Sequence, residues 1–227
     1  MNETLKAVIL LLIGWALGAI SAFLNDLLQT RRERRKAKAE REREIRKRLV
    51  GDYIQTSEVM TYIEAARERN EEPDLSRANL DSVDLRYKNL QGVKLYRANL
   101  DGADLNGTIL IEADLSKASL RDAKLYGARM QKANMLGARL IEARMKEVNL
   151  SKANLEVADL SKAYLKTAIL READLHEANL EGADLTDADL SEANLKQANL
   201  RGAKLAGAIL TGAILTGAIM PDGTVHD

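Results

Sequence analysis

The aspartates and the two histidines are the residues of this chain that could perform acid–base or metal chemistry. Many aspartates stand directly before a leucine, among them Asp104, Asp114, Asp159, Asp174, Asp184 and Asp189. A catalytic dyad such as Asp184 and Asp189 would use one carboxylate as an acid and the other as a base. Because these residues belong to a repeating pattern, we expect them instead to hydrogen-bond nearby backbone at bends.

The rest of the sequence offers no other reactive group. His176 follows a leucine of the repeat and is expected on the surface, far from His226. The chain has no cysteine, which excludes disulfides and thiolate metal sites. It also lacks a glycine-rich phosphate loop, a metal-ligand spacing and a nucleophile motif. We therefore expect no catalytic residue, no metal site and no cofactor, and interpret the protein as a non-enzyme.

A five-residue repeat organises most of the sequence. From Leu75 to Met220 every fifth residue is Leu or Met, which makes thirty positions in one frame. The residue two places earlier is Ala in twenty-four of them, and the exceptions include Pro73, Lys88 and Thr108. Such a register over about 150 residues indicates a repeat architecture.

A period of five fits neither a helix nor a continuous strand. Successive leucines would spiral around an α-helix, and they would alternate between the two faces of a strand. A chain that bends once per pentad instead points each Leu, with the Ala two places before it, into a common core. Ten of the fourteen glycines lie two places after the Leu, where a corner with positive φ would favour them. Other pentads have Glu, Lys or Asp there, so the corner must either vary or accept a side chain.

The stretch "ANLEGADLTDADLSEANL" resembles the pentapeptide-repeat proteins, whose consensus is A(D/N)LXX. The resemblance covers residues 73–220 and implies an all-β solenoid, a right-handed quadrilateral β-helix with four pentads in each coil. Lys88 departs from the pattern, because it places a cation at an inward alanine position. We expect either an irregular first coil or a position for Lys88 near the open end of the solenoid, since an unpaired buried charge is costly.

The region before the repeats is expected to be helical and to include a membrane anchor. Residues 1–6 form a short tail, and the run "AVILLLIGWALGAISAFLN" has no charge, so residues 7–28 are predicted to be a single transmembrane helix. A cleaved signal peptide and a buried soluble helix are the alternatives. Residues 31–48 contain eleven Lys or Arg and four Glu, which favours an uncleaved anchor with this flank, and the repeats, on the cytoplasmic side of the cell (inner) membrane.

Two more segments connect the anchor to the repeats. Residues 29–50 are predicted to be a basic juxtamembrane helix that contacts anionic lipid headgroups. The candidate contacts are Arg31, Arg32, Arg34, Arg35 and Lys36. Residues 51–72 are predicted to be a connector with a helix that covers the open end of the array. Thr56 or Ser57 is the expected N-cap, and Val59, Tyr62, Ile63 and Ala66 fall on one face.

The last repeats differ from the others. Residues 206–220 carry no charge, and Ile209, Ile214 and Ile219 replace the usual Asn or Asp before the Leu. These three residues are a candidate apolar end contact. Either the tail, residues 221–227, covers them, or they support an end-to-end homodimer, which the resemblance also suggests.

The sequence thus predicts a membrane-tethered scaffold that binds an unidentified protein partner. The resemblance implies one alternative, a DNA mimic that modulates a topoisomerase such as DNA gyrase. Residues 74–227 contain twenty Lys or Arg and twenty-two Asp or Glu, a net charge of −2 that suits a DNA mimic poorly. A purely structural spacer is a further alternative, and nucleic acid is not an expected partner.

Overall fold

The computed structural model describes residues 28–34, 36–37, 40, 44 and 55–227. The chain divides into two units, Met1–Arg46 and Lys47–Asp227, and each is described by itself. In the first unit every described residue is helical. Of the candidate lipid contacts, Arg31, Arg32, Arg34 and Lys36 are exposed on this helix, and Arg35 lies outside the described residues.

The expected membrane span, residues 7–28, lies outside the described residues except for its last position. Across the residues that are described, none of the helices combines the length and the apolar character that crossing a membrane requires. The anchor therefore stays a prediction.

The second unit begins with helix α2, Thr56–Glu68. Its residues Val59, Tyr62, Ile63 and Ala66 are buried on one face, as their spacing predicts. The predicted N-cap was wrong: the cap is Gln55, whose backbone N–H donates to Glu58. Thr56 is already helical, and its hydroxyl donates to the backbone carbonyl of Asp84 instead.

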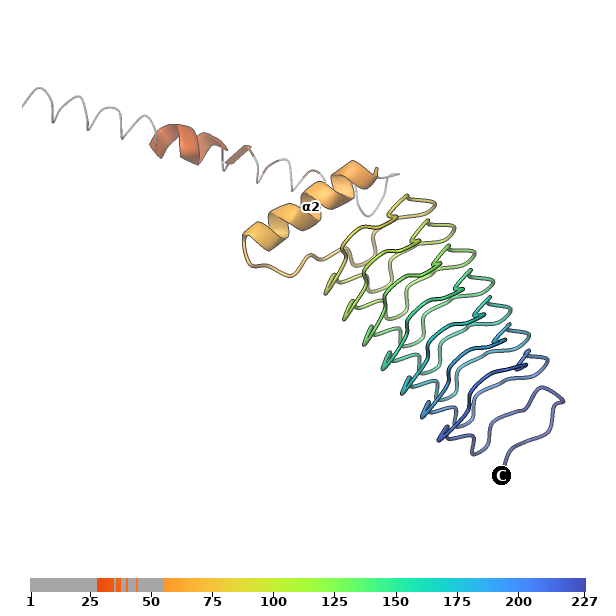
Figure 1. Ribbon diagram of the computed structural model, residues 1–227. Helices are drawn as coiled ribbons and strands as arrows, with labels where there is room; N and C mark the ends of the chain where they lie inside the picture. The colour runs from red at the N-terminus through yellow and green to blue at the C-terminus, as the bar shows by residue number, and fades with distance from the viewer. Residues whose placement is uncertain (1–27, 35, 38–39, 41–43, 45–54) are drawn as a thin grey trace, which may run out of the picture. The chain divides into compact units, whose positions relative to one another are not determined.

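The repeats form a four-sided solenoid, which confirms the all-β fold class of this region. Single residues before each Leu pair in parallel with the residue twenty positions later, in a series that runs from Asp74 with Lys94 to Asn199 with Ile219. A pairing distance of twenty residues means that four pentads complete one coil. Figure 1 shows the resulting stack of coils, with α2 at one end and the C-terminus at the other.

Each corner is a tight turn between one Leu and the next Ala. In the first turn the N–H of Ala78 donates to the carbonyl of Leu75, and Arg77, two places after the Leu, has a φ of 62°. A positive φ at that position is the pattern of a type II turn. Nineteen non-glycine residues at this position have a positive φ, as do ten glycines. The corner therefore does not vary; it accepts side chains at some cost in strain.

The backbone hydrogen bonds explain why Asn and Asp precede the Leu. In the pentad Leu100–Asp104, the N–H groups of Leu100, Gly102 and Asp104 bond to neighbouring coils, and that of Ala103 closes the turn. The fifth N–H, of Asp101, donates to Oδ1 of Asn99 at 3.2 Å. An Asn or Asp side chain at this position thus satisfies the donor that the backbone leaves unpaired.

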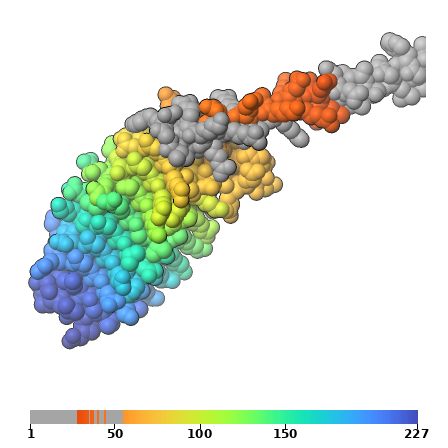
Figure 2. Space-filling view, turned by 180° about the vertical axis from the view of Figure 1, so that it is seen from behind, coloured from red at the N-terminus to blue at the C-terminus, as the bar shows by residue number. Residues whose placement is uncertain are grey.

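The core is a column of aliphatic side chains along the solenoid axis. Leu155, Leu160 and Leu185 have no exposed surface, and the alanine two places before each one is equally buried. Thr108 takes an alanine position and stays satisfied, because its hydroxyl donates to the carbonyl of Leu85 at 2.8 Å. Figure 2 shows the coils as successive bands of colour, each in contact with its neighbours. Such a core is stabilised coil by coil.

The two ends of the core are closed to different degrees. At the first coil, α2 covers the leucines, and Leu75, Leu80 and Leu85 are all buried. Arg67 of α2 also donates to the carbonyls of Asn89 and Gln91. At the last coil Leu205, Leu210, Leu215 and Met220 are only half-buried. The N-terminal end is therefore capped and the C-terminal end is largely open.

Candidate binding surfaces of the solenoid

The aspartates before the leucines have a structural role in this geometry. Oδ1 of Asp174 accepts the backbone N–H of His176 at 3.1 Å, and Oδ1 of Asp189 accepts that of Ser191 at 3.0 Å. Oδ1 of Asp184 accepts both the N–H and the hydroxyl of Thr186. The expected hydrogen bonds at the bends are therefore present.

The electrostatics of these carboxylates do not suit acid–base catalysis at neutral pH. The Thr186 hydroxyl bond lowers the pKa of Asp184 below its usual value, and the Ser191 hydroxyl bond lowers the pKa of Asp189. A carboxyl group acts as a general acid near neutrality only when its pKa is raised. Both groups are shifted in the opposite direction, so this pair has no acid to offer.

The two histidines lie in different parts of the repeat unit. Nδ1 of His176 lies 2.9 Å from the carbonyl of Lys196, whereas His226 lies in the C-terminal tail beside Asp227. No group of three or more potential ligands within the described residues could hold a metal ion.

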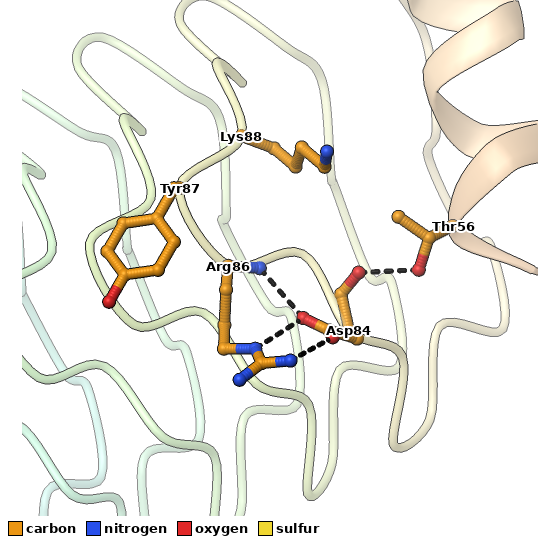
Figure 3. Close-up of a pocket in the computed structure, with 5 residues that line it drawn as sticks. All are labelled: Thr56, Asp84, Arg86, Tyr87 and Lys88. Carbon is orange, nitrogen blue, oxygen red and sulfur yellow. Dashed lines mark hydrogen bonds and ion pairs between the residues drawn. The ribbon is translucent and has the colours of Figure 1, made fainter.

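A hollow of about 430 Å³ lies where the start of α2 meets the first coil. Its lining residues are Thr56, Asp84, Arg86, Tyr87 and Lys88. Figure 3 shows the Arg86 guanidinium forked onto the Asp84 carboxylate, with distances of 2.9 and 2.7 Å, while Tyr87 points away from the helix. This contact lowers the pKa of Asp84 to about 2. The sequence pattern gave no sign of the hollow, because it depends on where α2 packs.

The structure explains how Lys88, the cation at an inward alanine position, is accommodated. The first coil is regular at this point, since the N–H of Lys88 closes its turn and its carbonyl accepts the N–H of Ile109. The side chain is half-buried and reaches the hollow beside α2 (Figure 3). Of the two expectations for Lys88, the position near the end of the solenoid is therefore the correct one. Lys88 lies at the N-terminal end, where its ammonium group reaches solvent.

The last coil presents an open edge. Among the described residues, the backbone N–H groups of Leu205, Leu210 and Leu215 have no backbone acceptor. Of the candidate end contacts, Ile209 and Ile214 are half-exposed, with 49% and 52% of their surface accessible. Ile219 is less exposed because it pairs with Val225 of the tail. The tail therefore covers one of the three isoleucines.

The four sides of the solenoid carry different outward side chains. We name them by the first paired residue of each column: face A begins at Asp74, face B at Asn79, face C at Asp84 and face D at Asn89. Faces A and B are mostly Asn and Asp, and their stacked amides and carboxylates bond to one another, as Asn179 does to Asp159 at 3.1 Å. Face C has the largest share of charged residues, both acidic and basic, and face D combines charged residues with isoleucines.

A four-sided solenoid of pentads with an Ala–Leu core defines a class of protein, and the family comparison agrees with it. The model for pentapeptide repeats matches in eight copies, over residues 74–110, 98–135, 108–146, 118–156, 149–187 and 183–220. The chain belongs to the pentapeptide-repeat family. This membership supports the right-handed sense expected for the coil.

Solved structures of the family are similar to this chain. HetL, a protein involved in heterocyst differentiation regulation in the cyanobacterium Nostoc, is 34% identical over 77% of this chain and all of its own, with a TM-score of 0.40. A protein of the Arabidopsis thaliana thylakoid lumen is 35% identical over 44% of this chain and 70% of its own, with a TM-score of 0.41. QnrB1, a plasmid-mediated fluoroquinolone resistance protein, is 25% identical over 63% of this chain and 76% of its own, with a TM-score of 0.49. No curated protein sequence matches significantly.

Proposed function

We propose that this protein is a membrane-tethered, non-enzymatic scaffold that binds another protein through an outer face of its solenoid. The main support is that the buried residues are nearly the same from coil to coil, while the outward side chains differ. The inner coils repeat a buried Leu or Met with, at most positions, a buried Ala, whereas face C runs through acidic, basic and aromatic residues. A stiff frame lowers the entropy cost of presenting many contacts to a partner.

Site-specific photocrosslinking in native membranes tests the partner. A photoreactive residue replaces one outward residue on each face: Asn134 on face A, Arg139 on face B, Lys124 on face C and Arg129 on face D. A specific partner is expected to crosslink from one face or two adjacent faces. Binding of that identified partner to the purified chain, and its loss when the same face is changed, completes the test. Equal absence of adducts from all four faces contradicts a scaffold and favours the spacer.

The tether is proposed from the uncharged segment before residue 28 and the basic residues that follow it. These features favour a single-pass anchor in the cell (inner) membrane with the solenoid in the cytoplasm. Membranes washed in alkaline carbonate should retain the full-length chain and release a variant that lacks residues 1–28. Complete extraction of the full-length chain contradicts the tether.

End-to-end association through the last coil is a second proposal, which the open edge supports. A row of unpaired backbone donors beside exposed apolar side chains is a template for pairing with another chain. Sedimentation of the purified chain should show a dimer that Ile214→Asp weakens, whereas Asp222→Asn in the tail leaves it unchanged. A DNA mimic is not favoured, since the repeat region carries a net charge of only −2. A gyrase supercoiling assay should show no inhibition, and inhibition would restore that alternative.

A further inference from the structure

Face C carries six outward residues in consecutive coils. When the order of this column is reversed, most of its charges meet a charge of opposite sign. The column runs Asp104, Lys124, Arg144, Tyr164, Asp184 and Lys204, and each member pairs through its backbone with the next. Its members point outward because the Leu and Ala on either side of each one point into the core. Lys124, Arg144, Tyr164 and Lys204 are exposed, and the two aspartates are half-buried.

From this column we infer that face C binds a second copy of this chain, side by side and antiparallel. A two-fold axis between the coils of Arg144 and Tyr164 reverses the order of the column in the second copy. Lys124 then meets Asp184 of the second copy, and Asp104 meets its Lys204. Arg144 meets Tyr164 of the second copy, a pairing that suits a cation over an aromatic ring. Two-fold symmetry makes every one of these contacts twice.

The corner before face C has the same complementarity at the same axis. At the first outward position of this corner Asp101 matches Arg201 and Arg121 matches Glu181, and at the second position Glu142 matches Lys162. Glu142 and Lys162 also form an ion pair of 3.7 Å within one chain. These positions were not used to choose the axis, so they add support to it. Together the column and the corner place opposite charges opposite each other across six coils.

Other arrangements of two copies on this face bring like charges together. A parallel pair sets every residue against itself, so Lys124 meets Lys124. Moving the two-fold axis by half a coil shifts the second copy by one coil. In one direction this shift sets Lys124 against Lys204, and in the other it sets Asp104 against Asp184. Like-charge contacts of this kind select against the wrong partner or register. In the favoured register a like-charged match occurs at the far corner, Lys146 with Lys166, where Lys146 also lies 3.4 Å from Glu147.

The charges of face C are only loosely paired within one chain. Nζ of Lys124 lies 3.7 Å from Asp104, and Nζ of Lys204 lies 3.8 Å from Asp184. No ion pair involves Arg144 among the residues that the structure describes. Exposed ion pairs of this length contribute little to the stability of the fold. Lys124, Arg144 and Lys204 can therefore turn toward a second copy with little loss. Asp104 and Asp184 keep their Oδ1 atoms on the backbone of their own turns and offer Oδ2 to the second copy. The contact should weaken as salt screens the charges.

Cysteine crosslinking of the full-length chain tests the register. The chain has no cysteine of its own. Lys124 and Asp184 are three coils apart, about 14 Å at the usual strand spacing, which is beyond the reach of a disulfide within one chain. The double variant Lys124→Cys/Asp184→Cys should therefore form a disulfide-linked dimer on oxidation. Lys124→Cys alone should not, because position 124 of one copy faces position 184 of the other. The two cysteines at position 124 would be three coil spacings apart across the interface.

A matched control lies on face A, on the opposite side of the solenoid. Asn134→Cys/Asn194→Cys places two cysteines sixty residues apart at the same position of the repeat. We expect it to form no disulfide-linked dimer under the same oxidation, although face C can still associate. Equal crosslinking of both double variants, or of Lys124→Cys alone, would overturn the proposed register.

An exchange of charges between positions 124 and 184 distinguishes a specific dimer from crosslinks that form by random collision. Lys124→Asp and Asp184→Lys each introduce a residue type that the fold already holds at this position, at Asp104 and Lys204. Each variant alone sets like charges against each other and should raise the dimer dissociation constant about tenfold or more. A mixture of the two should associate again, since one copy's change complements the other's. A wild type that sediments as a monomer at low salt, or a mixture no better than either variant, overturns the proposal.

Thermal unfolding of each variant, followed by circular dichroism, shows that the fold is intact. The outcome is independent of the proposed scaffold function. A protein partner that binds face A or face B leaves this homodimer possible, and the loss of the homodimer leaves such a partner possible. An end-to-end dimer is distinguished as well, because it survives both charge changes on face C and responds to Ile214→Asp.

Discussion

The side-chain amide of Asn194 donates a hydrogen bond of 2.9 Å to Oδ1 of Asp174, which lies one coil earlier on face A. The same Oδ1 accepts the backbone N–H of His176, and Oδ1 of Asn194 accepts that of Lys196. One column of side chains thus closes the turns within coils and links neighbouring coils. On face C the three aspartates close their turns in the same way. Lys124, Arg144 and Lys204 have no side-chain acceptor for an N–H, and their charges are available for contact with other molecules.

Asn194→Asp should destabilise the solenoid by about 1–2 kcal/mol at neutral pH, because it removes a donor and stacks two carboxylates. The turn within the coil should survive, since the new carboxylate still accepts the N–H of Lys196. The pKa of the stacked pair should rise above its value in the unfolded chain, so the loss should shrink as the pH falls below that raised pKa. Urea unfolding at pH 7 and pH 4 measures both effects, and a loss of equal size at the two pH values contradicts this account.

Leu155→Glu should unfold several coils, because it places a charge in the dry core. Leu155 has no exposed surface, and even Leu→Ala at such a site costs about 2–5 kcal/mol. Circular dichroism and limited proteolysis of the full-length chain measure the loss. Glu156→Gln changes the charge of the next, outward residue by one unit and should leave the protease pattern unchanged. Folded Leu155→Glu with normal protease resistance would refute the inward assignment.

Val157→Asn should stabilise the protein by about 0.5–1.5 kcal/mol. Val157 is a β-branched residue held at a φ of 50°, a left-handed conformation that Asn adopts more readily. The side chain is nearly half-exposed, so little burial is lost. Val157→Ala keeps the unfavourable conformation and should change the melting temperature little. A fall in the melting temperature of Val157→Asn would show that contacts of the valine outweigh its strain.

Arg86→Gln should raise the pKa of Asp84 from about 2 toward its ordinary value near 3.8, because it removes the forked guanidinium contact. A carboxyl group whose pKa is lowered by folding stabilises the native state above its unfolded pKa. This stabilisation is lost as the pH falls through the folded value, here between about 4 and 2.

An NMR titration of the Asp84 carboxyl carbon measures this pKa. Lys88→Gln removes a cation that acts on Asp84 only through space, and it should shift the pKa less than Arg86→Gln does. Equal shifts in the two variants would show that the general positive charge of the hollow, and not the forked contact, sets the pKa of Asp84.

Most of the solenoid could be predicted from the sequence because its determinants are local and repeated. The five-residue register from Leu75 to Met220 determines which side chains enter the core. Neither an α-helix nor a continuous strand would bury every fifth leucine on one side, whereas a bend in each pentad does. The structural role of Asp174 and Asp189 was predictable for the same reason, since each bonds to a backbone group two residues away. The N-cap of α2 was not predictable, because Thr56 bonds to a carbonyl that lies 28 residues ahead.

The sequence alone determined the period, the core and the outward positions of this protein, since each depends on residues within a few places of one another. Only the tertiary structure decided which outward residues become neighbours, because a coil of twenty residues sets Lys124 beside Arg144 and not beside Arg129. The structure also decided that α2 closes one end and that the other stays open. Those outcomes depend on packing between segments that are distant along the chain, which a local pattern does not encode.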